Sequence, residues 1–273
     1  MPSDPLAPLI DALHTSRLRV WSIIVTIYGD CIQPRGGRAA MTELQAITDR
    51  IGIEGGALRT AMSRLAQDGW VTRDREGRNS FYTLTEQGRA LSEPASQQIY
   101  RGTFSATDGR WILAISEQPA DPSKDGASLG VTRHVQLIGP EQIAERRTAG
   151  DLIVQGTPQE IPDWVKAAAM DSFLRDEYAR LAALLDPLSP DALAALSPLD
   201  ALALRVLLIH AWRRLVLRHP APPQGLMPDD WPGETCHAAL SRIYPALIKP
   251  SESFWDTATG ATGQRTLNTR FQP

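Results

Sequence analysis

The sequence predicts an α+β protein of several domains that begins with a winged helix-turn-helix. Three observations indicate this class. Helical hydrophobic patterns fill the N-terminal region, two short extended runs follow them directly, and a region of further extended runs gives way to helical patterns toward the C-terminus. We therefore divide the chain into residues 1–105, 106–180 and 181–273, as an N-terminal winged-helix domain, a central α/β domain and a C-terminal helical domain with a tail.

Length and composition are those of an ordinary globular protein. The chain has 273 residues, enough for two or three domains, and its 42% hydrophobic and 22% charged residues argue against global disorder. Its formal net charge of −3 gives no whole-molecule attraction to nucleic acid, so a DNA contact must come from arginines that are grouped locally.

The cysteines and the apolar stretches of the sequence indicate in which cellular compartment the protein is expected. Cys31 and Cys236 have neither a CxxC partner nor zinc-ligand spacing, so we expect no disulfide framework and no metal site. The start does not read as a secretory signal, and apolar stretches such as Leu202 to Ala211 contain an arginine and fall short of the roughly 20 residues that cross a bilayer. We expect a cytoplasmic protein that does not enter a membrane.

Three helices are predicted before residue 70. Apolar spacing predicts a first helix from Ser16 to Tyr28 that Gly29 ends, and residues 33–38 are a turn by composition. Thr42 is expected to cap a second helix that Gly52 breaks. The third helix runs from about Glu54 to Gln67 and buries one apolar face, made of Leu58, Ala61, Met62 and Leu65.

A β-hairpin and a fourth helix complete the N-terminal pattern. Extended runs at residues 70–73 and 80–84 flank a polar segment that contains Gly77, which is typical of a hairpin. Thr85 then opens a helix that reaches roughly to Tyr100. Helix, helix, helix and hairpin follow one another in winged-helix order.

The remaining chain is expected to be β-rich and then helical. The predicted strands are Trp111 to Ile115, Val131 to Ile138 and Leu152 to Gln155. Helices are expected from Asp163 through Leu185, over residues 191–196, over 199–219 and over 233–247. Residues 251–273 lack apolar periodicity and are predicted to be an extended or poorly ordered tail.

The third helix is the candidate for reading DNA, because a helix fits the major groove and its exposed side chains reach base edges. Its apolar face leaves Arg59, Thr60, Ser63 and Arg64 pointing elsewhere, and the first three are our candidates for base-edge contacts. The alternative is a helix face that is simply solvated.

The hairpin carries three further candidate DNA contacts. Arg73, Arg75 and Arg78 lie in or beside the wing, where cations can contact the phosphate backbone. Asp74 and Glu76 dilute this charge, and residues 1–105 hold 12 arginines against 11 acids, so a soluble hairpin tip is the alternative.

No enzyme motif emerges. Cys236 and His237 are adjacent, so on a helix they point about 100° apart and are not arranged as nucleophile and base. The sequence has no GxSxG, P-loop or HExxH motif. We therefore expect no catalytic residues and no enzymatic activity.

Several short motifs, in this order, resemble the PaaX family, bacterial repressors of phenylacetate-degradation operons. The resemblance extends over nearly the whole chain. The matching stretches are Ser16-Arg17-Leu18-Arg19, Tyr28-Gly29-Asp30, Pro34-Arg35-Gly36-Gly37, Leu58 to Leu65, Asp68-Gly69-Trp70, Gly77 to Tyr82, Leu84-Thr85, Leu208-Ile209-His210, Arg213-Arg214, Leu226 and Asp230-Trp231-Pro232-Gly233.

The resemblance implies a winged-helix domain, a central ferredoxin-like α/β domain and a C-terminal helical domain. It also implies a homodimer that binds double-stranded operator DNA, represses a catabolic operon and is released by an aryl-CoA thioester such as phenylacetyl-CoA, with no cofactor. Between Ser116 and Val131 this chain shows no amphipathic helix where the family's central domain carries a longer helical segment, so a trimmed central domain is expected.

An aryl-CoA effector would need cations for its phosphates and an apolar slot for its acyl group. Candidate effector-binding residues on the predicted 199–219 helix share one side of that helix, and Trp231 follows them: His210, Arg213, Arg214, Arg218 and Trp231. The alternatives are salt bridges from the arginines to Asp171 or Glu177, and a packing role for the tryptophan.

A second hypothesis is a winged-helix scaffold that binds proteins and never meets DNA. The near-neutral charge of residues 1–105 supports it. Salt dependence separates the two, because DNA binding weakens steeply as salt rises and a scaffold shows no specific DNA affinity.

Overall fold

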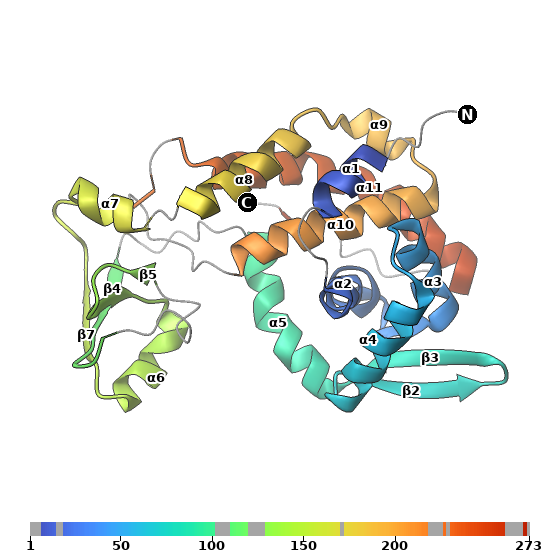
Figure 1. Ribbon diagram of the computed structural model, residues 1–273, viewed down its shortest axis with the longest axis horizontal. Coiled ribbons are helices and arrows are strands. Elements are labelled where there is room, and N and C mark those ends of the chain that lie inside the picture. The colour runs from blue at the N-terminus through green and yellow to red at the C-terminus, as the bar shows by residue number, and fades with distance from the viewer. Residues whose placement is uncertain are drawn as a thin grey trace. The chain divides into compact units, whose positions relative to one another are not determined.

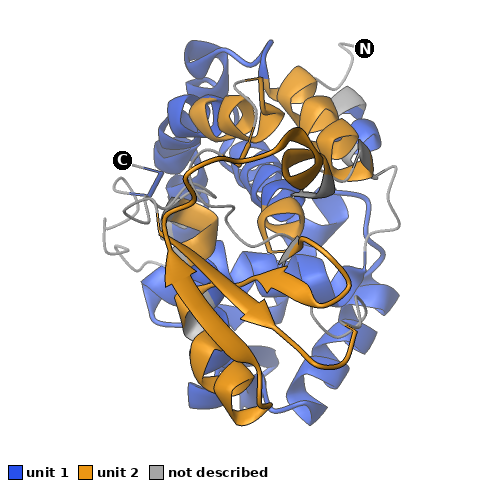
Figure 2. Cartoon of the chain, turned by 90° about the vertical axis from the view of Figure 1, so that its left-hand side faces the viewer, with its two compact units in different colours: residues 1–97, 186–212, 239–272 blue, residues 98–185, 213–238, 273 orange. Residues whose placement is uncertain are grey.

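The computed structural model describes residues 7–14, 19–101, 110–119, 129–169, 172–217, 226–227, 230–259 and 270–271 (Figure 1). These residues form a mainly helical α+β structure with two small antiparallel sheets, so the predicted mixed class is confirmed. The chain divides into two compact units (Figure 2): unit 1 comprises residues 1–97, 186–212 and 239–272, and unit 2 comprises 98–185, 213–238 and 273. The domain boundaries at residues 105 and 180 stay a prediction.

Unit 1 is built from both ends of the sequence. Its N-terminal elements are α1 (Ala7–His14), α2 (Val20–Ile27), the π-helical turn η1 (Tyr28–Ile32), the 3-10 turn η2 (Gln33–Arg35), β1 (Arg38–Ala40), α3 (Met41–Arg50), α4 (Gly55–Gln67), β2 (Val71–Glu76), β3 (Asn79–Leu84) and α5 (Glu86–Arg101). The later elements are α9 (Pro190–Ala194), α10 (Pro198–Val216) and α11 (Pro232–Thr259). Helices α5, α10 and α11 contribute residues to both units.

A tight glycine turn joins α3 to α4. Gly52 has a φ of 80°, in the left-handed region that glycine adopts readily, and the Ile53 N–H donates to Thr48 O at 2.9 Å. Gly55 lets the start of α4 approach α3 closely, because a Cβ there would lie 2.7 Å from Gln45 Oε1. The predicted third helix is confirmed, starting at Gly55 and ending at Gln67.

The cap of α3 differs from the prediction. The helix begins at Met41, before Thr42, and the Ala40 N–H donates to Glu43 Oε2 at 2.7 Å. The carboxylate of the first turn therefore satisfies the N–H of the residue that precedes the helix, whereas a capping Thr42 would accept from an N–H two or three residues after it.

The predicted hairpin is confirmed and gains a third strand. The sheet has the order β1-β3-β2, with all neighbours antiparallel and Glu76 opposite Asn79 at the closed end. Gly77, with a φ of 63°, is the first residue of the two-residue loop, where a type II′ turn places glycine. The short β1 was missed because the glycine-rich stretch before it has the composition of a turn.

Gly29 does not end the first helix. After α2 the chain continues through Gly29 as η1, and the Gln33 N–H donates to Tyr28 O in the π-helical pattern. Asp30 and Cys31 on this turn are buried. Glycine was a poor stop signal here because tertiary contacts of Asp30, given below, hold the turn.

One hydrophobic core joins the N-terminal helices to α10. It contains Leu44 and Ile47 of α3, Leu58 of α4, and residues of α2, the hairpin and α11. Helix α10 adds Leu202, Ala203, Val206 and Leu207 to the same core. The C-terminal helices therefore stabilise the region that holds α4 and the hairpin.

Helix α11 extends past its predicted end at residue 247 and past Pro245 and Pro250, to Thr259. The predicted tail is thus wrong for residues 251–259. Prolines weaken a helix interior, but Tyr244, Leu247 and Trp255 are all buried, and their packing keeps the helix intact. The other predicted C-terminal helices match α9 and α10, and Thr85 opens α5 as expected, since its Oγ1 accepts from the Gly88 N–H at 2.9 Å.

Unit 2 contains a four-stranded sheet with the order β5-β6-β4-β7 and antiparallel neighbours throughout. Its strands are β4 (Trp111–Ile115), β5 (Leu129–Gly130), β6 (Val135–Leu137) and β7 (Leu152–Gly156), and its helices include α6 (Ile143–Thr148), α7 (Asp163–Ala169) and α8 (Ser172–Leu185). The first and last predicted strands are confirmed. Of the predicted strand 131–138 only β6 is a strand, and bends at residues 131–134 join it to the short β5. Helix α6 was missed. Most of the segment expected to be trimmed lies outside the described residues.

Candidate nucleic-acid interface

Helix α4 separates an apolar face from a polar one. Leu58, Ala61, Met62 and Leu65 are buried, as predicted. The four candidate DNA contacts on this helix, Arg59, Thr60, Ser63 and Arg64, are all exposed. The helix therefore presents an arginine- and hydroxyl-bearing face to solvent while its other face holds the core.

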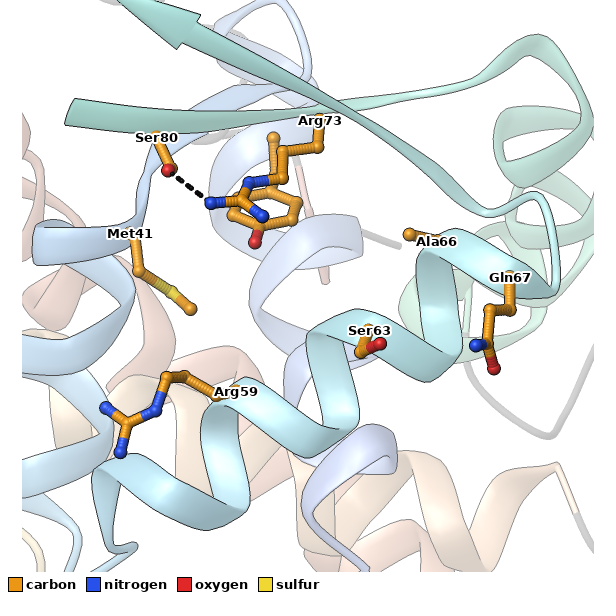
Figure 3. Close-up of a pocket in the computed structure, with 8 residues that line it drawn as sticks. Met41, Arg59, Ser63, Ala66, Gln67, Arg73 and Ser80 are labelled. Carbon is orange, nitrogen blue, oxygen red and sulfur yellow. Dashed lines mark hydrogen bonds between the residues drawn. The ribbon is translucent and has the colours of Figure 1, made fainter. Parts of the chain in front are cut away.

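A hollow with a volume of about 630 Å³ lies between α4 and the hairpin (Figure 3). Arg59, Ser63 and Gln67 line it from α4, and their spacing of four residues places them along one side of the helix. The remaining lining residues are Met41, Ala66, Arg73, Ser80 and Tyr82. Helix and hairpin thus contribute polar groups to one hollow, and three predicted contacts, Arg59, Ser63 and Arg73, meet there.

Neighbouring strands position Arg73. Its Nη2 donates to Ser80 Oγ at 3.0 Å, and its guanidinium lies 5.9 Å from the centre of the Tyr82 ring (Figure 3). The backbone of Tyr82 is held by a hydrogen bond, because Oη of the buried Tyr28 donates to Tyr82 O at 3.1 Å. The guanidinium is therefore steered toward the hollow by contacts within the sheet.

The hairpin separates its charges by strand alternation. Side chains of a strand point alternately to opposite faces, so Arg73 and Arg75 share the face of the buried Val71, while Asp74 and Glu76 lie on the other face. Glu76 forms an ion pair with Arg38, whose guanidinium lies 3.8 Å from the centre of the Phe81 ring. Asp74 and Glu76, which offset the positive charge of the hairpin in the sequence, thus lie on the side away from the hollow.

The other predicted contacts are exposed but do not line the hollow. Thr60 Oγ1 donates to Gly56 O at 3.0 Å within the helix, and Arg64 Nε lies 3.8 Å from Asp68 Oδ2. Arg75 lies on β2 and Arg78 in the hairpin loop. A DNA contact by any of the seven residues stays a prediction.

Five lining residues were not predicted from the sequence: Met41, Ala66, Gln67, Ser80 and Tyr82. Gln67 could have been found, because it continues the spacing of Arg59 and Ser63. Tyr82 could not, since an aromatic residue on a strand is usually part of the core, and this one is also buried.

The candidate effector residues lie in different settings. His210 is buried and its Nδ1 lies 3.0 Å from Thr26 Oγ1, while Arg213 and Arg214 are half-buried on α10, where burial lowers the pKa of Arg213. Trp231 is buried, with its ring 5.3 Å from that of Tyr178. Arg218 lies outside the described residues.

The two acids suggested as alternative partners of these arginines, Asp171 and Glu177, do not test the effector site. Glu177 pairs with Arg180 at 2.9 Å, and Asp171 lies outside the described residues. An effector site at His210, Arg213, Arg214, Arg218 and Trp231 stays a prediction.

The thiol of Cys236 is held as a structural group. Its Sγ donates to Tyr178 O at 3.1 Å, and burial raises its pKa to about 12, so the thiol is neutral at physiological pH. Burial also lowers the pKa of His237. Within the described ranges, no three His, Cys, Asp or Glu side chains are grouped as metal ligands would be. No helix in that part of the chain has the length and hydropathy of a membrane span.

Comparisons with known proteins agree with one another. A family model described as PaaX-like protein matches residues 19–88, and one described as PaaX-like protein C-terminal domain matches residues 171–257. The Transcriptional repressor PaaX of Escherichia coli strain K12 is 30% identical over 259 aligned residues, which cover 85% of this chain and 82% of that protein. An uncharacterised protein of Mycobacterium tuberculosis has a similar fold, with a TM-score of 0.57 and 18% identity over 86% of this chain and 97% of its own. The first matched region contains α4, the hairpin and the hollow between them.

Proposed function

The chain belongs to the PaaX-like family, and from this premise we propose that it is a DNA-binding transcriptional repressor of a phenylacetate-type catabolic operon. The observation that carries the proposal is the hollow shared by α4 and the hairpin, where Arg59, Ser63 and Arg73 come together. In this proposal α3, α4 and the hairpin are a winged helix-turn-helix. Helices and hairpin follow one another in the required order and share one core.

In the proposed complex α4 enters the major groove of double-stranded DNA. Arg59 and Ser63 reach base edges, where an arginine can donate two hydrogen bonds to guanine, and Gln67 lies on the same side of the helix. Arg73, Arg75 and Arg78 contact phosphates and fix the position of the hairpin without reading sequence. The acids on the far face of the hairpin remain away from the DNA backbone.

The remaining parts of the proposal concern assembly and regulation in the cytoplasm. A homodimer would present two α4 helices to a palindromic operator. In unit 2 the order β5-β6-β4-β7, with α6 between β6 and β7, supports the ferredoxin-like assignment. An aryl-CoA thioester releases the operator only if it binds the DNA-incompetent state more tightly than the DNA-bound one.

Binding to the DNA upstream of the protein's own operon tests the proposal. We expect Arg59→Ala to weaken specific binding about 5- to 150-fold, because an arginine–guanine contact contributes roughly 1–3 kcal/mol of discrimination. The matched control is Arg147→Ala, which removes an exposed arginine of α6 in unit 2 and should leave the affinity unchanged. Fluorescence anisotropy with upstream and scrambled duplexes gives both affinities, and specific binding that survives Arg59→Ala undiminished contradicts this role for α4.

The scaffold hypothesis loses its main support once the charges are placed in space. It rested on the balance of charges in residues 1–105, yet strand alternation puts Arg73 and Arg75 on one face and Asp74 and Glu76 on the other. Titrations at several salt concentrations decide between the two, since a scaffold would show no specific DNA affinity at any of them.

A further inference from the structure

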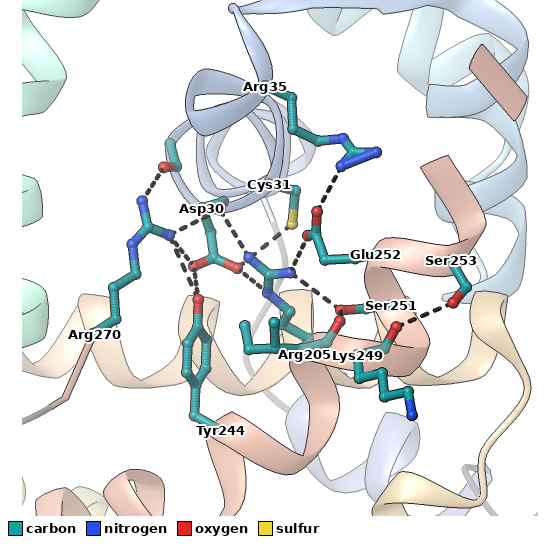
Figure 4. A network of polar contacts seen from close by, with 12 residues as sticks. Asp30, Cys31, Arg35, Arg205, Tyr244, Lys249, Ser251, Glu252, Ser253 and Arg270 are labelled. Atoms are coloured by element: carbon teal, nitrogen blue, oxygen red, sulfur yellow. Dashed lines mark hydrogen bonds and ion pairs between the residues drawn. The ribbon is translucent and has the colours of Figure 1, made fainter. Parts of the chain in front are cut away.

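Arg270 is docked against η1 in unit 1 (Figure 4), and the adjacent Phe271 contacts Tyr244 of α11. Arg270 Nη1 donates to both Asp30 O and Asp30 Oδ1 at 2.8 Å, and its Nη2 donates to Gly29 O at 3.4 Å. Phe271 is only 3% exposed, and its ring lies 5.1 Å from that of Tyr244. A guanidinium and an aromatic ring, adjacent in the chain, thus fill neighbouring positions.

The π-helical turn explains why side-chain donors are needed at this place. In η1 the Gln33 N–H donates to Tyr28 O, five residues back. The donor that would reach Gly29 O in this register belongs to Pro34, and proline has no N–H. The planar fork of an arginine can satisfy this carbonyl together with the neighbouring carbonyl and carboxylate of Asp30.

The backbone of Phe271 shows that its docking contributes stabilising contacts. Its φ of 60° lies in the left-handed region, which is unfavourable for a bulky residue unless surrounding contacts compensate. Burial of the ring and its contact with Tyr244 supply this compensation.

The carboxylate of Asp30 keeps other donors when the tail is absent. Arg205 Nε donates to Asp30 Oδ2 at 2.7 Å, and Tyr244 Oη donates to Asp30 Oδ1 at 2.8 Å (Figure 4). Both donors lie on α10 and α11, independent of the C-terminal residues. Arg270 and Phe271 can therefore undock without leaving the buried carboxylate of Asp30 unpaired, and unit 1 can stay folded when they do.

We propose that Gly29, Asp30 and Tyr244 form a receptor slot for an arginine–aromatic dipeptide, and that Arg270–Phe271 occupies it as a detachable C-terminal latch. The latch holds η1, and η1 carries Tyr28, whose Oη donates to the backbone oxygen of Tyr82, a residue that lines the hollow. Latch docking therefore stabilises the geometry of the operator-binding surface. This last step rests on the proposed function, whereas the latch itself does not.

The direct test uses the full chain with the slot emptied by Arg270→Ala/Phe271→Ala. A fluorescent peptide with the sequence of residues 264–273 should bind this variant saturably and should not bind the wild-type chain, whose slot is filled. The same peptide with either Arg270→Ala or Phe271→Ala should bind at least about tenfold more weakly than the unchanged peptide. Absence of peptide binding to the folded variant, or equal binding of the alanine peptides, overturns the latch.

Thermal unfolding gives a second readout that does not depend on the affinity of the free peptide. We expect the double variant to melt about 5 °C lower than wild type, and Arg270→Lys to recover only part of the loss because an ammonium group lacks the planar fork. Arg242→Ala, which removes an exposed arginine of α11, is the matched control and should melt as wild type does. An unchanged melting temperature of the double variant also overturns the latch.

Operator affinity tests the coupling to the hollow. The double variant should bind the operator about fivefold more weakly than wild type, and wild-type affinity in a variant that does bind the peptide overturns the coupling. If no form of the protein binds operator DNA, the proposed function fails while peptide binding still decides the latch. The two failures are therefore distinguishable.

Discussion

Arginines occupy two opposite settings in unit 1. On the surface formed by α4 and the hairpin, Arg59 and Arg73 are exposed and face a hollow. In the network around Asp30, Arg205 is 0% exposed and its partners belong to the protein itself (Figure 4). The surroundings of an arginine, and not the residue type, therefore decide whether it holds the fold together or remains available to a ligand.

The buried network satisfies one charge with several partners. Arg205 donates from Nε to Asp30 Oδ2, from Nη2 to Asp30 O and from Nη1 to Ser251 Oγ and Glu252 Oε1, over 2.7 to 3.1 Å. Burial alone would lower the pKa of Arg205, but the charge of Asp30 and the neighbouring Tyr244, Cys31 and Glu252 outweigh it and hold the pKa above its usual value. The guanidinium thus stays charged inside the core.

The largest effect is expected from breaking this network. Arg205→Met keeps an unbranched side chain but leaves Asp30, itself 1% exposed, without its main ion-pair partner. Removing one member of a buried pair typically costs about 3–5 kcal/mol, whereas exposed substitutions stay within about 0.5 kcal/mol. Urea denaturation should therefore show a large loss for Arg205→Met and almost none for Arg59→Ala. Equal stability of the two variants would show that the buried Arg205 holds the fold together no more than the exposed Arg59 does.

The exposed setting was predictable from the sequence because it is local. The positions of Arg59 and Ser63 follow from the period of one helix, and Arg73 follows from a hairpin with a glycine turn. The class of fold, the α4 face and the order of α2, α3, α4, the hairpin and α5 needed no partner distant in the chain.

The buried network was not predictable in the same way, because its members come together only in the folded chain. Asp30 and Arg205 are 175 residues apart, and Asp30 and Tyr244 are 214 apart. The sequence held one signal, the arginine inside the apolar stretch Leu202 to Ala211, and it could not name the partner. Gly29 was read as a helix stop for the same reason, since the contacts that hold η1 come from α10, α11 and the C-terminus.

An intermediate effect is expected from the exposed charges of β2. Arg75 and Asp74 are adjacent and both exposed, yet strand alternation puts only Arg75 on the face of the hollow. Arg75→Ala should lower affinity for any duplex several-fold and reduce the slope of log affinity against log salt by roughly 0.9, the value for one phosphate contact. Asp74→Asn changes the net charge by the same amount in the other direction and should alter affinity and slope by much less. Effects of equal size would show that net charge alone, and not the face of the hairpin, governs binding.

The smallest effect is expected at Glu43, a carboxylate in the first turn of α3 that is buried like Arg205. It is 6% exposed, and burial raises its pKa although the Ala40 N–H, Arg35 and Arg38 act in the opposite direction. Because the pKa of Glu43 is higher in the folded chain than in the unfolded one, ionised Glu43 reduces stability at a pH above the folded-state pKa. This reduction disappears as the pH falls below the unfolded-state pKa.

Glu43→Gln keeps an oxygen that can accept from the Ala40 N–H and removes the charge, so it should be more stable than wild type at pH 7 by less than about 1 kcal/mol. The difference should shrink steadily toward pH 4 in urea denaturations at several pH values, while Glu145→Gln, an exposed glutamate of α6, should show no such trend. A Glu43→Gln variant that is less stable at pH 7 and equal to wild type in acid would mean that the ionised carboxylate stabilises α3, which is the reverse of what burial predicts.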